Sequence, residues 1–293
     1  MATRLPRGCT NNQNTLTRIG DRVIKCGPAL DGEIYFYRTI RHPLFPALYE
    51  STPTSLTIEY IEGPTVSAMF RTKRLQYDTL KIIVASARLL HNEPAHDTHT
   101  PTPDMVYDNI MGNLDRHYAN APAVYDTLPH ATQLFEHLRT LLRAYVNSPE
   151  LRIVNVIHGD LWFENILFTD SKDVKFIDMR GKAGPLHTVK GDPTLDFAKL
   201  YQSILGFDYT LYDEAYDPEY ERELCEWARS MEIPIDSPAV QAMTAACILK
   251  SFFYFSDSSK IYPTYRLLWK LPIVRDTFPM PGVDYSTKIS AVG

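Results

Sequence analysis

Residues 153–178 contain two carboxylates and an amide at spacings that could bind a metal ion and accept a proton. Two apolar stretches flank the polar residues 170–173, a pattern typical of a β-hairpin. If Thr169 and Val174 close a regular four-residue loop, Asn165 lies opposite Asp178, with Cβ atoms about 4.5–5.5 Å apart. A carboxylate and an amide oxygen at that separation can share one Mg²⁺, which prefers oxygen ligands and keeps waters for a substrate's phosphates. A shift of one residue would turn the two groups to opposite faces, so this prediction depends on the loop.

The third residue, Asp160, follows an apolar strand candidate in the sequence His158-Gly159-Asp160 and precedes Asn165 by five residues. A carboxylate in a loop at this point can lie near the metal ligands and accept a proton from an attacking hydroxyl. One strand, one loop and one hairpin would then deliver a base and two metal ligands together. That combination predicts phosphoryl transfer to an alcohol.

The elements that must position these residues change in type along the chain. Residues 1–63 are β-rich, with strand candidates at 15–18, 23–25, 47–49 and 56–61, and with one helix that Asp31 caps and that ends before Pro43. Gly63-Pro64 breaks the pattern. Helical spacing then dominates in residues 80–90, 134–145, 219–231, 238–255 and 264–270, and residues 91–103 form a loop. The sequence predicts an α+β chain with a small β-rich N-lobe, residues 1–63, and a larger, mainly helical C-lobe, residues 64–293.

Composition and charge narrow the function classes. The 293 residues are 44% hydrophobic and 22% charged, proportions typical of a globular protein. The formal net charge of −5 gives no general attraction to nucleic acid or to anionic lipid. The longest mainly apolar stretch, residues 239–255, is interrupted by Gln241 and Lys250 and predicts a buried helix rather than a membrane insertion. Four cysteines without a paired spacing favour a reducing, cytoplasmic location. The oligomeric state is left open.

Three segments together resemble a known superfamily. They are His158–Leu167, which reads H-G-D-L-x-x-x-N-I-L, then Phe176–Asp178, and then Gly191–Ala198, which reads G-D-P-x-x-D-x-A. In this order and spacing they resemble the aminoglycoside phosphotransferase and choline kinase superfamily, whose bilobal fold is like that of protein kinases. The resemblance implies that Asp160 is the catalytic base, that Asn165 and Asp178 bind Mg²⁺, and that ATP is the phosphate donor. It also implies that Asp196 braces the catalytic loop.

In the N-lobe the same resemblance implies the nucleotide contacts. Lys25 would reach the α- and β-phosphates of ATP, and Glu33 would be its ion-pair partner, with Glu50 as the alternative. Backbone groups of Glu59 and Ile61 would bind the edge of the adenine. Residues 8–13 are either the loop that covers the phosphates or part of an N-terminal tail.

The acceptor is predicted only as a class, the hydroxyl of a small molecule. Residues 206–226 combine acidic side chains with tyrosines, which is typical either of a pocket for a cationic or sugar-like alcohol or of a solvated helix face. Met179-Arg180-Gly181 and Gly191-Asp192-Pro193 favour the aminoglycoside-kinase side of the resemblance and weaken a choline assignment without excluding it. The predicted acceptor is therefore an aminoglycoside, a sugar or an amino alcohol.

Two other functions compete with a small-molecule kinase. A protein kinase is disfavoured because about 18 residues separate Asp178 from Asp196 and no Ala-Pro-Glu motif follows. A non-catalytic, kinase-like nucleotide-binding module is disfavoured because Asp160, Asn165 and Asp178 are all present.

Overall fold

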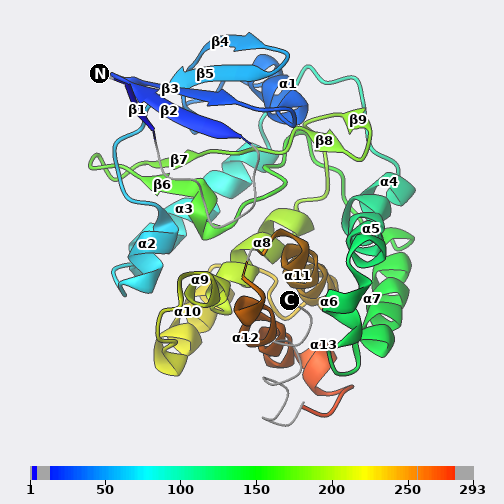
Figure 1. Cartoon of the computed structure of the whole chain (residues 1–293). Coiled ribbons are helices and arrows are strands. Elements are labelled where there is room, and N and C mark those ends of the chain that lie inside the picture. Colours follow the sequence, from blue (N-terminus) through cyan, green and yellow to red (C-terminus); the bar gives the residue numbers. More distant parts are fainter. Residues whose placement is uncertain (1, 5–13, 256, 281–293) are drawn as a thin grey trace. The chain divides into compact units, whose positions relative to one another are not determined.

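The computed structural model describes residues 2–4, 14–255 and 257–280 (Figure 1). The chain forms two compact units, one made of residues 1–101 and 152–196 and the other of residues 102–151 and 197–293. The first unit holds every described residue of the predicted site. The division of the chain at residue 63 into two lobes stays a prediction.

The first unit begins with a five-stranded antiparallel sheet in the order β1-β2-β3-β5-β4. Its strands are β1 (Ala2–Arg4), β2 (Thr15–Ile19), β3 (Arg22–Cys26), β4 (Leu48–Thr52) and β5 (Ser55–Glu59). The four predicted strands are confirmed as β2 to β5. Strand β1 has no apolar alternation and lies at the sheet edge, so no sequence pattern indicated it.

Helix α1 (Asp31–Thr39) connects β3 to β4 and carries Glu33. Its Phe36 side chain is fully buried and contacts Phe45 edge-on, with ring centroids 5.0 Å apart. The predicted cap is wrong by one residue: Leu30 precedes the helix, and Asp31 is its first residue. The Asp31 carboxylate is bound instead by Lys182 and His187, at 2.9 and 3.0 Å.

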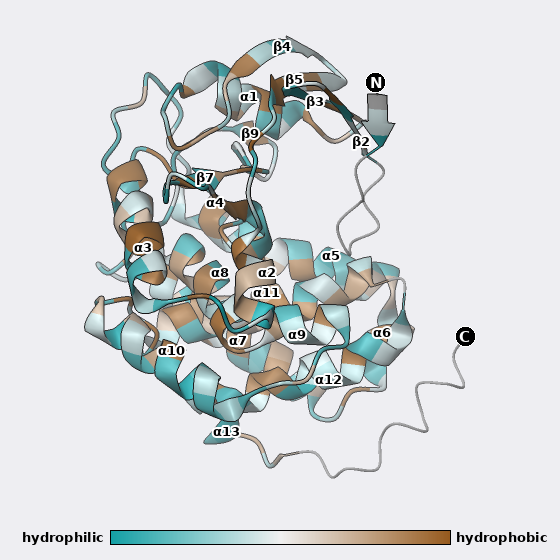
Figure 2. Cartoon of the chain, turned by 90° about the vertical axis from the view of Figure 1, so that its left-hand side faces the viewer, coloured by the Kyte–Doolittle hydropathy of each residue, from teal (hydrophilic) through white to brown (hydrophobic). Residues whose placement is uncertain are grey.

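Two further α-helices and two short hairpins are described in this unit. The helices are α2 (Val66–Arg71) and α3 (Tyr77–His91), and the strands pair as β6 (Ile166–Phe168) with β7 (Val174–Phe176) and β8 (Lys182–Ala183) with β9 (Leu186–His187). In α3, the apolar residues at helical spacing, such as Leu80, Ile83 and Val84, are buried, whereas Leu89 is exposed. Figure 2 shows the corresponding hydrophobic and hydrophilic bands along this helix.

The second unit is helical throughout its regular elements. The first residues of helix α8 (Thr194–Ile204) belong to the first unit, and the rest of this helix belongs to the second. In the second unit, α11 (Pro238–Ser251) packs against α7 (Ala131–Val146) and α5 (Asn113–Asn120). The other α-helices described are α4 (Pro103–Tyr107), α6 (Pro122–Asp126), α9 (Phe207–Tyr212), α10 (Pro218–Ser230), α12 (Ile261–Arg266) and α13 (Pro272–Arg275). A five-stranded N-terminal sheet followed by a mainly helical region confirms the predicted fold class.

The prediction of a buried helix at residues 239–255 is confirmed for its main part, because residues 239–249 of α11 are all buried. Within the described parts of the chain, no helix is both long enough and apolar enough to cross a membrane.

Candidate active site

The carboxylate of Asp196 accepts hydrogen bonds from the backbone of the loop that carries Asp160. The backbone N–H groups of His158 and Gly159 donate to the two Asp196 oxygens at 2.9 and 2.8 Å. His91, in the last turn of α3, contacts the same carboxylate at 3.0 Å. Asp196 is fully buried. The bracing role that the resemblance implied for Asp196 is therefore confirmed. Sequence reasoning missed His91, because a histidine 105 residues away carries no signal of this contact.

The His158 ring fixes the loop against the hairpin. Its Nε2 lies 2.9 Å from the Ile177 carbonyl oxygen, and the Asp160 N–H donates to its Nδ1 at 3.2 Å. Nδ1 therefore accepts, and Nε2 carries the proton. Burial lowers the pKa of His158 more than the nearby carboxylates raise it, which keeps the ring neutral in this role.

Asn165 holds Asp160 from the other side. It ends a single 3₁₀ turn, Phe163–Asn165, and its Nδ2 donates to the Asp160 carbonyl oxygen at 2.8 Å and to Asp160 Oδ2 at 3.4 Å. Because the amide nitrogen faces Asp160, the amide oxygen of this buried residue faces away from it. An oxygen in that position is the group that a hard cation would use.

The predicted hairpin register is wrong by one residue. Ile166 pairs with Phe176 and Phe168 with Val174, so the loop includes Thr169 and Asn165 lies opposite Ile177 rather than Asp178. The Ile177 N–H donates to the Asn165 carbonyl oxygen at 3.1 Å. The chain then turns at Asp178, whose φ of +60° is left-handed, so the strand pattern does not govern where this side chain points.

Asp178 instead joins a buried ion cluster with Lys25 and Glu33. Lys25 Nζ lies 2.6 Å from Glu33 Oε2 and 2.8 Å from Asp178 Oδ1. The Lys25 and Glu33 side chains are only 6% and 7% exposed, whereas that of Asp178 is 47% exposed. The structure thus joins α1, β3 and the end of the hairpin at one ammonium group, and it favours Glu33 over Glu50, which is exposed on β4.

The electrostatics of this cluster follow from two carboxylates sharing one cation. Burial alone would lower the pKa of Lys25, but Glu33 and Asp178 outweigh it and raise that pKa well above its usual value. Burial raises the pKa of Glu33 to about 7, with Asp178 adding to the shift and Lys25 opposing it. The second oxygen, Glu33 Oε1, is buried and has no hydrogen-bond partner among the described residues.

Two glycines bring α1 close enough for this cluster to form. A Cβ on Gly32 would collide with the Arg180 carbonyl oxygen, and one on Gly181, at φ +58°, would collide with that of Gly32. Gly159, at φ +81°, lies against the Arg180 side chain, and a Cβ at this position would come within 2.9 Å of Arg180 Cβ. Only residues without a Cβ allow both backbone approaches.

The candidate site residues form two groups: Asp160 with Asn165, and Lys25 with Glu33 and Asp178. Among the described residues, no hydrogen bond joins Asn165 to Asp178. The part of the chain that the structure describes also contains no cluster of three or more histidine, cysteine or acidic side chains placed to hold a metal ion by itself. One carboxylate and one amide oxygen fit a Mg²⁺ ion whose other ligands are phosphates and water.

The remaining predicted residues have partly defined surroundings. The Glu59 N–H donates to the Ala47 carbonyl oxygen at 2.9 Å, and the Tyr60 N–H donates to that of Asp21 at 2.7 Å, so this segment after β5 is tied to the sheet. The adenine contacts of Glu59 and Ile61 stay a prediction. Residues 8–13, which were predicted as either the phosphate-covering loop or part of an N-terminal tail, lie outside the described residues.

Within residues 206–226, part of the acidic and aromatic pattern is used in packing. Glu221 pairs with Lys270 at 2.6 Å, and the Lys270 ammonium lies 3.5 Å from the centroid of the Tyr216 ring. Burial raises the pKa of Glu221, and Lys270 opposes that shift. These contacts assign a structural role to two of the residues, and both interpretations of the stretch remain open.

Comparison of the sequence with models of known protein families and with curated proteins finds no match. Solved structures do match the fold. Plasmodium vivax ethanolamine kinase gives a TM-score of 0.55 at 14% identity, over 99% of this chain and 81% of that one. The aminoglycoside phosphotransferase APH(2″)-IIa in complex with gentamicin gives 0.55 at 14%, over 92% and 91%. ADP-bound APH(2″)-Ib gives 0.54 at 13%, over 92% and 94%.

These matches show a kinase-like fold. More narrowly, the chain has the fold that ethanolamine kinases and aminoglycoside phosphotransferases share, as its sequence motifs predicted.

Proposed function

We propose that this protein is an ATP- and Mg²⁺-dependent phosphotransferase that transfers the γ-phosphate to a hydroxyl group of a small molecule. The observation that carries the proposal is the pairing of Asp160 with Asn165 in the unit that also holds the Lys25, Glu33 and Asp178 cluster. The ADP in the APH(2″)-Ib structure supports an adenine nucleotide as the donor.

Asp160 is the proposed base. Its backbone is fixed by His158 and Asn165, and its carboxylate accepts the proton of the acceptor hydroxyl as the oxygen–phosphorus bond forms. The bond between the γ-phosphorus and the bridging oxygen breaks, and ADP leaves. Asn165 and Asp178 would hold Mg²⁺, and the bound ion would neutralise charge that develops on the phosphates. Lys25 would contact the α- and β-phosphates, and Glu33 would keep its ammonium in place.

The proposed acceptors are aminoglycosides, sugars and amino alcohols. One matched structure is an ethanolamine kinase, and another is a complex with gentamicin. Ethanolamine and gentamicin both carry amine and hydroxyl groups. A protein substrate is disfavoured, because residues 182–187 between Asp178 and Asp196 are occupied by the short β8–β9 hairpin. The protein would act in the cytoplasm, which is supported by Cys26, Cys225 and Cys247 all being free thiols.

An ATP-consumption screen across aminoglycosides, amino alcohols, monosaccharides and nucleosides tests the proposal, with GTP as a second donor. We expect turnover with at least one of these acceptors and only in the presence of Mg²⁺. In a thermal-shift assay, ADP with Mg²⁺ should stabilise the wild type and Asp236→Ala, an exposed control, but not Asp178→Ala. Stabilisation by ADP without turnover of any acceptor would favour a nucleotide-binding module, and absence of both would overturn the proposal.

A further inference from the structure

Helix α1 is held on one face by the segment that follows Asp178. Residues 180–189, which include the β8–β9 hairpin, lie beside this helix in the first unit (Figure 1). The Asp31 carboxylate, on the first residue of α1, accepts from Lys182 Nζ at 2.9 and 3.1 Å, and His187 Nε2 lies 3.0 Å from it. Burial alone would raise the pKa of Asp31, but Lys182 and His187 outweigh it and lower that pKa, so the carboxylate is charged in this contact.

A second contact with the same segment lies one turn further along α1. The Tyr35 hydroxyl donates to Asp97 Oδ1 at 3.1 Å. The other oxygen, Oδ2, accepts from Thr188 Oγ1 and from the Val189 N–H, both at 2.8 Å. Because the Asp97 side chain is buried, these hydrogen bonds are shielded from water. The His187 ring also lies beside the Tyr35 ring, with centroids 5.5 Å apart, so this turn of the helix is tied to the end of the segment.

Between these two contacts the backbones of the helix and the segment meet. Gly32 lies against the Arg180 carbonyl oxygen, and Gly181 lies against that of Gly32, in both cases closer than a Cβ would permit. At about 100° per residue, positions 31, 32 and 35 share one face of α1. That face is therefore the one that residues 180–189 cover.

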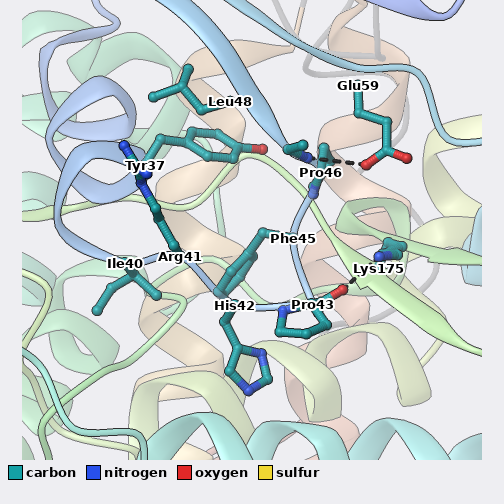
Figure 3. A pocket seen from close by; sticks show the side chains of 11 residues that line it. Tyr37, Ile40, Arg41, His42, Pro43, Phe45, Pro46, Leu48, Glu59 and Lys175 are labelled. Atoms are coloured by element: carbon teal, nitrogen blue, oxygen red, sulfur yellow. Dashed lines mark hydrogen bonds between the residues drawn. The ribbon is translucent and has the colours of Figure 1, made fainter.

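Glu33 lies on the opposite face of the same helix. It is roughly 150° around α1 from the centre of the covered face, and there it binds Lys25 of β3 at 2.6 Å. Tyr37, one turn after Glu33, lines a pocket together with Leu48 of β4 (Figure 3). Helix α1 therefore lies between residues 180–189 and the five-stranded sheet, and the contacts on its covered face limit how far Glu33 can move from Lys25.

The ion pair of Glu33 with Lys25 is a weak anchor for the helix. Both side chains are buried, and removing two charges from water costs free energy that their attraction returns only in part. Glu33 Oε1 is buried without a hydrogen-bond partner among the described residues, which adds to that cost. A pair that gains so little depends on contacts elsewhere on α1 to keep it formed.

We propose that residues 180–189 position Lys25 for the nucleotide through α1, with Asp31 and Asp97 as the positioning residues. This inference rests on the proposed function, in which Lys25 contacts the α- and β-phosphates. When Asp31 loses its partners, α1 moves more freely against the sheet and Glu33 no longer keeps the Lys25 ammonium in one place. The nucleotide must then order this group as it binds, so its affinity falls.

Labelling of Lys25 by an amine-acylating reagent, followed by mass spectrometry without nucleotide, tests the positioning itself. In the wild type, Lys25 should react more slowly than the exposed Lys172, because its ammonium is buried beside two carboxylates. Asp31→Asn should speed the labelling of Lys25 about threefold, the scale that a partly exposed ion pair permits. Tyr35→Phe, which removes only the hydrogen bond to Asp97, should speed it by a similar factor.

Two control variants lose comparable contacts in the second unit. Asp236→Asn loses the pairing with Arg229, and Tyr125→Phe loses a hydrogen bond of 3.2 Å to the Leu249 carbonyl oxygen. Neither should change the labelling of Lys25, although both remove a stabilising contact. If Asp31→Asn and Tyr35→Phe also left the labelling of Lys25 unchanged, the proposal would be overturned.

Titration calorimetry with ADP and Mg²⁺ tests the link to the nucleotide. Asp31→Asn should raise the dissociation constant about threefold, and Lys182→Gln, which leaves the charge of the helix unchanged, should also raise it. Because both substitutions remove one contact, the double variant should lose less affinity than the product of the two single effects. Effects that multiply, or an unchanged affinity for ADP, would overturn the positioning role. If the wild type does not bind ADP, the proposed function fails, while the labelling still decides whether this segment positions Lys25.

Discussion

Asp196→Ala should destabilise the protein strongly, because one fully buried carboxylate satisfies two backbone donors and His91. The substitution leaves the N–H groups of His158 and Gly159 buried without an acceptor. Each such loss costs about 1–3 kcal/mol, and the contact with His91 is lost as well. We therefore expect the free energy of unfolding to fall by about 3–5 kcal/mol.

Urea denaturation followed by tryptophan fluorescence measures this change, since Trp162 lies in the same loop. Asp196→Asn keeps one oxygen acceptor and should lose less than Asp196→Ala. Asp236→Ala is the matched control: this carboxylate pairs with Arg229 at the surface, and its loss should cost less than about 1 kcal/mol. If Asp196→Ala lost no more stability than Asp236→Ala, the account of how the loop is held would be wrong.

Three further predictions follow from the same structure. Because burial raises the pKa of Glu33 to about 7, the folded state binds an extra proton between about pH 4.5 and 7, and this group lowers the free energy of unfolding as pH rises through that window. In urea denaturation from pH 5 to 8, the free energy of unfolding of Glu33→Gln should therefore depend less on pH than that of the wild type. Identical slopes for the two proteins would contradict the shift in the Glu33 pKa. Gly159→Ala should lower the free energy of unfolding by about 1–3 kcal/mol more than Gly184→Ala in chemical denaturation. Both glycines have positive φ, but a Cβ at Gly159 would meet Arg180, whereas nothing lies within 4 Å of a Cβ at Gly184. Equal losses would refute the close contact of Gly159 with Arg180. Tyr37→Phe should keep or raise the melting temperature, since it removes a buried hydroxyl that has no partner among the described residues. Tyr125→Phe loses a hydrogen bond of 3.2 Å, and its free energy of unfolding should fall by about 1 kcal/mol. A larger loss of stability at Tyr37 than at Tyr125 would show that the Tyr37 hydroxyl has a partner.

Much of the fold was predictable because the patterns are local. The alternation of strand β5, in which Leu56 and Ile58 are buried, and the helical spacing of α3, α7 and α10 each reflect one buried face. The breaks at Gly20 and Pro43 are turn chemistry. These features depend on neighbours in sequence, so the chain alone indicates them.

The residues of the candidate site could be proposed from the sequence, but their geometry could not. The hairpin register depended on loop length, and a loop longer by one residue placed Asn165 opposite Ile177. Asp178 reaches Lys25 through a left-handed turn, which no periodicity indicates. Long-range partners such as His91 and Asp196 are joined only by tertiary packing. The ion pair of Lys25 with Glu33 was predictable because the resemblance supplied it.

The turnover of Asp160→Asn tests the central proposal most directly, once the screen has identified an acceptor. The variant should bind ATP with Mg²⁺ as tightly as the wild type, while kcat falls at least about 10²-fold, the usual scale for the loss of a general base. A variant that binds ATP and turns over at the wild-type rate would show that Asp160 is not the base and would contradict the proposed chemistry.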